Sequence, residues 1–256
     1  MDGELFSIEL PDGAEIAARF QAGRDRCPWI VFVHGFGSSQ EGDKVRSFRS
    51  WSQEAGLGFA SFDFRGHGES GGSMSELTLT RNLTDLRAVL DALAVRDPKS
   101  MQRTILLGSS MGAATAMWLC ARQPRRIAAS VLIAPAVHAG ASFERWAGTE
   151  GIAEWKRKGT ITFEGEFVTA ELDWEFLRDL RTYRMQDLLK LYKTPSLVLQ
   201  GLEDDTVLAS DVLDFVQKTD AEMDCVLYAR GDHRLTDEKL RLWTSILDFL
   251  SVRGLL

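Results

Sequence analysis

The sequence contains little cysteine. Its three cysteines, Cys27, Cys120 and Cys225, are spread over 256 residues. They form no C-x-x-C pair, and an odd, widely spaced set argues against both a disulfide framework and a zinc site. Cys120 and Cys225 lie in apolar runs. We therefore expect buried thiols and no metal centre.

Long apolar runs and blocks of basic residues are also missing. No stretch approaches the roughly 18 consecutive apolar residues of a membrane-spanning helix. The formal net charge is −7, and lysines and arginines do not cluster; this argues against nucleic acids and anionic membranes as partners. The first residues, Met1-Asp2-Gly3-Glu4, have neither the basic nor the apolar region of a secretory signal. The expectation is a cytoplasmic protein without membrane insertion, and its oligomeric state stays open.

The order of apolar patterns indicates an α/β fold. A hydrophobic fraction of 45% supplies a sizeable core, and strand patterns alternate with helical ones after an N-terminal hairpin. Such alternation implies right-handed βαβ units and a mostly parallel sheet with helices on both faces. The expected strands are 4–10, 14–20, 29–33, 59–63, 104–107, 127–133, 195–200 and 224–228, and the expected helices 42–55, 79–93, 113–119, 211–216 and 240–250.

One interval interrupts this alternation. About sixty residues separate the strand ending near Ala134 from the next one, which is too many for a simple crossover. We therefore expect an α/β core of residues 1–135 and 193–256 with a cap inserted at 136–192. A hairpin over 159–169 is the one element that its pattern suggests. The alternative is a surface extension with a small core of its own.

The most informative motif is Gly108-Ser109-Ser110-Met111-Gly112, of the form G-x-S-x-G. A buried strand pattern precedes it and a helical pattern follows, which is the context of a nucleophile elbow. In such a turn the serine stands clear of the sheet, and the helix N-terminus lies behind it. Ser110 is therefore the candidate nucleophile.

A serine hydroxyl needs a base, and the base needs an acceptor that orients it. His233 follows the last expected strand, and Asp204 follows the strand that ends at Gln200. The order serine, acid, histidine is that of α/β-hydrolases. Glu203, Asp205 and Asp232 are rival acids; the spacing G-x-x-D-x-x-V favours Asp204.

Donors for a tetrahedral oxyanion are expected from two backbone amides. Those of Phe36, in the glycine-rich loop 34–37, and of Met111, which follows the nucleophile, fit the requirement. His34 is interpreted as supporting this loop from beneath. The Gly66-His67-Gly68-Glu69-Ser70 segment is interpreted as a turn at the sheet edge, without a direct part in catalysis.

Together these motifs resemble the α/β-hydrolase superfamily over about residues 5–253. They are H-G-F-G at 34–37, D-F-R-G-H-G-E-S at 63–70, G-S-S-M-G at 108–112, G-L-E-D-D-T-V at 201–207 and G-D-H-R at 231–234. The elbow, Glu154–Gly159, 203–205 and 232–234 resemble the abhydrolase-domain-containing protein 10 group, which includes acyl-protein thioesterases and acyl-glucuronide esterases. The cap also looks like those of bacterial cinnamoyl and feruloyl esterases.

The predicted function is hydrolysis of carboxylic esters or thioesters through an acyl-enzyme on Ser110, without a cofactor or metal. A small-molecule ester or acyl-thioester with an apolar or aromatic acyl group is the expected substrate. Five cap aromatics are candidate contacts for that group: Trp146, Trp155, Phe163, Phe167 and Trp174. The alternatives are a small peptidase or amidase, and a non-catalytic binding or scaffold protein that retains the fold.

Overall fold

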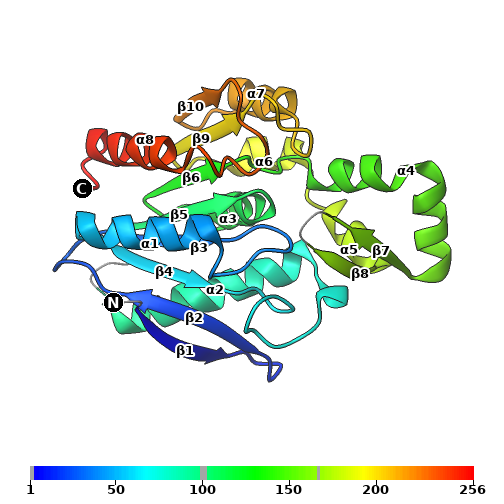
Figure 1. Ribbon diagram of the computed structural model, residues 1–256, viewed down its shortest axis with the longest axis horizontal. Helices are drawn as coiled ribbons and strands as arrows, with labels where there is room; N and C mark the ends of the chain where they lie inside the picture. The colour runs from blue at the N-terminus through cyan, green and yellow to red at the C-terminus, as the bar shows by residue number, and fades with distance from the viewer. Residues whose placement is uncertain (1–2, 99–102, 166–167) are drawn as a thin grey trace.

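The computed structural model describes residues 3–98, 103–165 and 168–256, which form a sheet of eight strands flanked by helices (Figure 1). The strand order is β1-β2-β4-β3-β5-β6-β9-β10. β1 and β2 form the N-terminal hairpin, and β2 is antiparallel to β4. The other neighbours are parallel. The predicted mostly parallel α/β sheet is thereby confirmed.

The strands are β1 Glu4–Glu9, β2 Glu15–Gln21, β3 Trp29–Val33, β4 Gly58–Phe62, β5 Thr104–Ser109, β6 Ala129–Ile133, β7 Thr160–Glu164, β8 Thr169–Asp173, β9 Ser196–Gly201 and β10 Met223–Tyr228. The helices are α1 Asp43–Ala55, η1 Met74–Glu76, α2 Leu79–Arg96, α3 Met111–Arg122, α4 Ala139–Lys158, α5 Trp174–Leu180, α6 Met185–Leu191, α7 Ala209–Lys218 and α8 Lys239–Val252. β3, β4, β5, β6 and β9 are buried along their whole length, as expected for strands covered on both faces.

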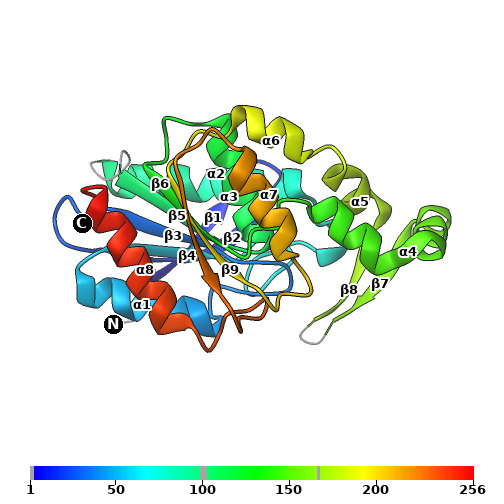
Figure 2. The ribbon, with the colours of Figure 1, turned by 90° about the horizontal axis from the view of Figure 1, so that it is seen from above.

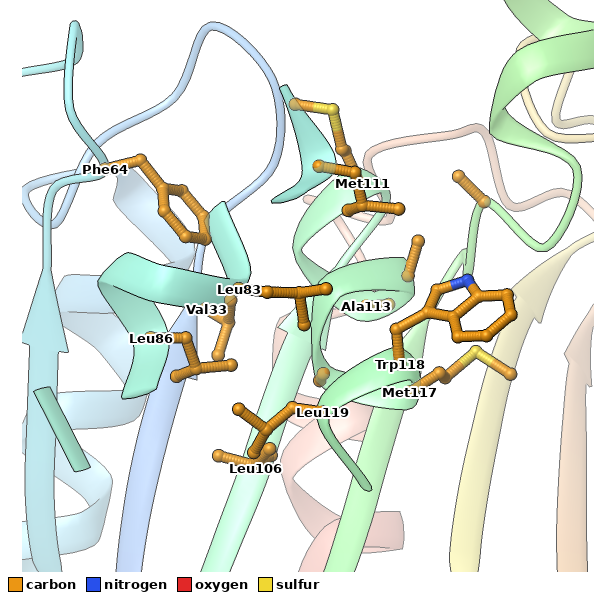
Figure 3. Close-up of a cluster of buried hydrophobic side chains, with 14 of the residues drawn as sticks. Val33, Phe64, Leu83, Leu86, Leu106, Met111, Ala113, Met117, Trp118 and Leu119 are labelled. Atoms are coloured by element: carbon orange, nitrogen blue, oxygen red, sulfur yellow. The ribbon is translucent and has the colours of Figure 1, made fainter. Parts of the chain in front are cut away.

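Two apolar cores cover the two faces of the sheet. α1 and α8 lie on one face, and α2, α3 and α6 lie on the other (Figure 2). Figure 3 shows how α3 packs: Leu119 reaches Leu106 of the central strand β5, while Leu83 and Leu86 of α2 fill the adjoining space. The helix that follows Ser110 is therefore held firmly against the sheet.

Residues 139–191 contain α4, the two-stranded sheet β7–β8, α5 and α6. The hairpin was predicted, whereas the long helix α4 was not. Three glycines interrupt its sequence, and only Trp155 of the helix is buried. At Gly148 the backbone turns to φ 65°, ψ 173°, and the helix bends there (Figure 1). Together with α5 and β7–β8 it projects to one side of the sheet.

Candidate active site

Ser110 occupies a sharp turn between β5 and α3. Its backbone has φ 55° and ψ −118°, a strained conformation for a residue with a side chain. The turn closes because two glycines allow near contact. A Cβ on Gly112 would lie 2.1 Å from the carbonyl oxygen of Val33, and one on Gly108 would lie 2.5 Å from Cα of Ala113. The two glycines of the G-x-S-x-G pattern are therefore required because the turn leaves no room for a side chain at either position.

Three side chains from distant parts of the chain meet at this turn. The Ser110 hydroxyl lies 3.0 Å from Nε2 of His233. Nδ1 of the same imidazole lies 2.9 Å from Oδ2 and 3.1 Å from Oδ1 of Asp204. With Nδ1 protonated, the ring donates to the carboxylate and presents Nε2 as an acceptor to the serine hydroxyl. This is the arrangement that a serine nucleophile needs.

The Asp204 side chain has no exposed surface, and its carboxylate is held from several directions. Its Oδ1 accepts hydrogen bonds from the amides of Thr206 (3.0 Å) and Val207 (2.8 Å), and Oδ2 accepts one from Nε2 of Gln200 (3.1 Å). Burial alone would raise the pKa of this carboxyl group. The hydrogen bonds and the nearby His233 outweigh burial and hold the pKa below its usual value. Asp204 therefore stays ionised and fixed in place.

The three rival acids lie elsewhere. Glu203 is exposed and stands 3.8 Å from Arg230. Asp205 is exposed as well. Asp232 accepts the amide hydrogen of Leu235 at 2.6 Å, which closes the loop that carries the imidazole. Among the described residues, none of the three makes a hydrogen bond to that imidazole.

The loop after β3 passes directly beside Ser110. A Cβ built on Gly35 would lie 3.3 Å from Cβ of Ser110 and 3.1 Å from the carbonyl oxygen of Ser109. The next residue is Phe36, and Met111 begins α3 on the other side of Ser110. Neither of these two amides donates to an acceptor within the described part of the chain. Met111 follows Ser110 directly and Phe36 follows Gly35, which lies against Ser110, so the oxyanion role of the two amides stays a prediction.

Two histidines bind this loop to the neighbouring one after β4. Nε2 of His34 accepts the amide hydrogen of Phe64 at 3.0 Å, and Nδ1 of the ring lies 2.8 Å from the carbonyl oxygen of Gly35. In the opposite direction, Nε2 of His67 accepts the amide hydrogen of Gly37 at 3.3 Å. Burial lowers the pKa of His34 to about 3, with a smaller contribution from His67. The ring of His34 is therefore neutral, as an Nε2 acceptor must be.

This buried ring should make stability depend on pH. Because the pKa of His34 is about 3 in the folded protein and 6.5 as its ordinary value, the unfolded chain binds the extra proton first as pH falls. The free energy of unfolding should therefore decrease between about pH 6.5 and 3, by up to about 1.4 kcal/mol per pH unit from this group.

Urea unfolding at several pH values in this window measures the slope. His34→Gln keeps a hydrogen-bonding side chain without the titration, so it should unfold more easily at pH 7 but show a shallower decline towards acid. An identical slope in the variant would contradict the assignment.

Lys44 is a residue of the site that the sequence did not reveal. From α1 its Nζ reaches Oγ of Ser109 (3.2 Å) and the carbonyl oxygen of Arg234 (2.7 Å). Burial, followed by the nearby charge of Arg234, lowers its pKa to about 8. Lys44 thus connects the residue before Ser110 to the residue after His233. No motif surrounds it, so only the three-dimensional structure identifies it.

The five aromatic candidates fall into different environments. Trp155 has no exposed surface, and its indole N–H donates to the carbonyl oxygen of Leu172 at 2.9 Å. It packs on Trp174 with ring centroids 5.7 Å apart. The expectation that Trp155 contacts substrate is corrected, because it fills the core between α4 and the β7–β8 hairpin. Phe167 lies outside the described residues.

Trp146 and Phe163 lie instead toward the active-site loop. Their rings are 4.8 Å apart, and the ring of Phe163 is 5.1 Å from that of Phe36. Phe143, which the sequence did not single out, joins the same group at 5.7 Å from Phe36. Trp146 is 39% exposed. This group, and not Trp155, is the aromatic surface next to the loop that carries the candidate oxyanion amide.

Comparisons with known proteins give the family of the chain. A family model described as serine aminopeptidase, S33 (Hydrolase_4) matches residues 25–160, more than half of the chain. The chain belongs to this family. It is an α/β-hydrolase, and the segment that matches includes the loop after β3, the elbow and α4.

Known proteins match the chain over most of its length. The chain is 25% identical over 237 residues to the mitochondrial palmitoyl-protein thioesterase ABHD10 of Bos taurus, covering 90% of this chain and 74% of that protein. A putative hydrolase from Agrobacterium vitis S4 has a TM-score of 0.82 at 26% identity, covering 96% and 97%. Est1E from Butyrivibrio proteoclasticus with ferulic acid bound has a TM-score of 0.76 at 20% identity, covering 96% and 99%. These likenesses support hydrolysis of esters or thioesters in general.

Two negative findings apply to residues 3–98, 103–165 and 168–256. None of their helices is long and apolar enough to span a bilayer. Nor do three or more histidine, cysteine, aspartate or glutamate side chains gather there as a metal ion would require.

Proposed function

We propose that this chain is a serine hydrolase that cleaves carboxylic esters or thioesters through an acyl-enzyme on Ser110. The observation that carries the proposal is the continuous hydrogen-bonded path from the Ser110 hydroxyl through His233 to Asp204. In the first step, Nε2 of His233 removes the hydroxyl proton as Oγ of Ser110 attacks the substrate carbonyl. The imidazolium that results is stabilised by the buried Asp204 carboxylate.

The negative charge that forms on the carbonyl oxygen needs donors beside Ser110. The amides of Phe36 and Met111 are the proposed donors, and the N-terminus of α3 adds its positive dipole. His233 then gives its proton to the departing alcohol or thiol. Water, activated by the same imidazole, releases the acyl group and regenerates Ser110.

For the acyl group we propose an apolar or aromatic chain that contacts Trp146, Phe143 and Phe163. Phe143 and Phe163 adjoin Phe36, next to the proposed carbonyl position, and Trp146 packs on Phe163 farther out. The related ABHD10 is described as a palmitoyl-protein thioesterase, and the structurally similar Est1E holds ferulic acid. The palmitoyl group and ferulic acid that these descriptions name are apolar and aromatic, respectively. A cytoplasmic location stays a prediction.

A substrate panel tests the proposal. It comprises p-nitrophenyl esters from acetyl to decanoyl, a phenylpropanoyl ester, the matching acyl thioesters, and aminoacyl p-nitroanilides. Steady turnover of esters or thioesters supports the assignment. Turnover restricted to the anilides would favour the aminopeptidase activity that the family's description names, and no turnover of any member would favour a binding protein.

Chain-length preference should depend on Trp146. Each methylene that becomes buried adds about 0.8 kcal/mol to binding, so kcat/KM should rise several-fold per methylene until the aromatic surface is covered. Trp146→Ala should flatten this slope, losing most for long chains and least for acetyl. Trp51→Ala is the matched control, because Trp51 is a tryptophan of α1 that packs against Trp243, away from the inserted segment. A wild-type preference for acetyl esters would contradict the proposed acyl class.

A further inference from the structure

Phe36 joins two parts of the molecule. Its backbone belongs to the loop beside Ser110, while its half-buried side chain points into the aromatic group of the inserted segment. The ring is 5.1 Å from Phe163 of β7, 5.7 Å from Phe143 of α4 and 6.3 Å from Phe176 of α5. The first two contacts are edge-to-face, at 86° and 84°. Such pairs contribute beyond simple burial and have a defined geometry.

The rings that surround Phe36 are themselves fixed. Phe143 and Phe176 stand 4.7 Å apart at 88°, and Phe176 has no exposed surface. Phe176 also packs near Trp155, which is fully buried. Phe143, Phe163 and Phe176 together form the aromatic socket of Phe36. The position of this socket is set by the core of the inserted segment, residues 139–191, and not by the sheet.

On the other side, the core holds the two residues that flank Phe36. Gly35 lies against Ser109 and Ser110 so closely that a Cβ would be at 3.1 and 3.3 Å from them. The amide of Gly37 donates to His67. Between these two points the amide of Phe36 has no partner in the described chain. The carbonyl end of the same peptide unit is held as well, because the oxygen of Gly35 accepts hydrogen bonds from Nδ1 of His34 at 2.8 Å and from the amide of Ser38 at 3.3 Å. At the Cα end of this unit, the ring of Phe36 is held by the aromatic rings of the inserted segment and lies 6.5 Å from His67.

We infer that Phe36 is a positioning residue: the aromatic socket of the inserted segment holds its ring and so keeps its amide directed at the oxyanion. The inference rests on the proposed function and deepens it. It assigns the inserted segment a part in turnover itself, in addition to acyl selectivity. Substrates too short to reach the socket should depend on it as well.

The first test uses an acetyl ester, whose acyl group does not reach the socket. Phe36→Ala retains the backbone amide but removes the ring. Complete loss of one oxyanion donor costs about 10²–10³-fold in kcat, so a loosened donor should lower kcat about 10- to 100-fold with KM nearly unchanged. Phe36→Tyr keeps the ring and should recover most of the activity. Trp51→Ala serves as the control for aromatic truncation outside the socket.

The second test works at a distance from the reacting atoms. Phe163→Ala leaves residue 36 intact but removes one wall of the socket, and it should also lower kcat for the acetyl ester. Adding Phe163→Ala to Phe36→Ala should lower kcat little further, because Phe36→Ala has already removed the ring that Phe163 holds. If circular dichroism shows that Phe36→Ala does not fold, the kcat of Phe163→Ala on the acetyl ester decides the test.

A trifluoromethyl ketone provides the third readout, because its adduct with Ser110 carries the oxyanion. Phe36→Ala should weaken its inhibition by the same factor as kcat, whereas the corresponding secondary alcohol should bind equally to both proteins. If the wild type turns over the acetyl ester but Phe36→Ala and Phe163→Ala keep kcat within twofold, the positioning role is overturned while the proposed function stands. If the wild type hydrolyses no ester or thioester, both are overturned.

Discussion

Replacing Ser110 by alanine should reduce ester and thioester turnover by three or more orders of magnitude while the protein still folds. Loss of a triad nucleophile removes the covalent path and leaves only what the oxyanion donors and binding supply. Within the described part of the chain its hydroxyl bonds to His233, and alanine accepts the same backbone strain as serine. Steady-state kinetics and a thermal unfolding curve measure the two parts of the expectation.

Ser109→Ala is the matched control, because Ser109 precedes the nucleophile and is buried at the end of β5. Its hydroxyl accepts a hydrogen bond from Lys44 and does not contact His233, so we expect a far smaller change in kcat. Undiminished activity in Ser110→Ala would rule out the mechanism. A crippled Ser109→Ala beside an active Ser110→Ala would move the nucleophile by one residue.

Asp204→Asn should be nearly as damaging, at up to about 10⁴-fold in kcat, as in a comparable triad. An amide at this position no longer requires a protonated Nδ1, so His233 is free to adopt the tautomer that cannot accept the serine proton at Nε2. The carboxylate also loses its charge, which would otherwise stabilise the imidazolium.

The rival acids supply the controls. Glu203→Gln and Asp205→Asn change exposed side chains and should leave kcat within a few-fold. Asp232→Asn is more informative, because Asp232 shapes the loop that carries the imidazole through the Leu235 amide. We expect an intermediate effect there. If Asp205→Asn or Asp232→Asn proves the most damaging change, the acid has been assigned to the wrong residue.

Local patterns in the sequence are sufficient for the core of the fold. Continuous apolar runs such as Trp29–Val33 become central strands, and the leucine spacing after Leu79 becomes the buried face of α2. The site motifs are local as well. The elbow, the loop after β3 and the acidic and histidine loops each follow a strand, so the parallel sheet brings them to one edge.

What the sequence leaves open depends on packing between distant segments. Lys44 lies on a helix that reveals nothing of its contacts with Ser109 and Arg234, and Gln200 looks like an ordinary strand residue before it proves to support Asp204. The cap aromatics are the clearest case. Nothing local distinguishes Trp155, which is buried, from Trp146, which is exposed, because the arrangement of α4 against β7–β8 decides it.

The central claim is that Ser110 is an activated nucleophile, and intact mass measurement after treatment with an alkyl fluorophosphonate tests it most directly. The account predicts one adduct per wild-type chain, located by peptide mapping at Ser110 and formed more slowly in Asp204→Asn. It predicts no adduct in Ser110→Ala. An unmodified wild type, an adduct at another serine, or equal labelling of Ser110→Ala would contradict it.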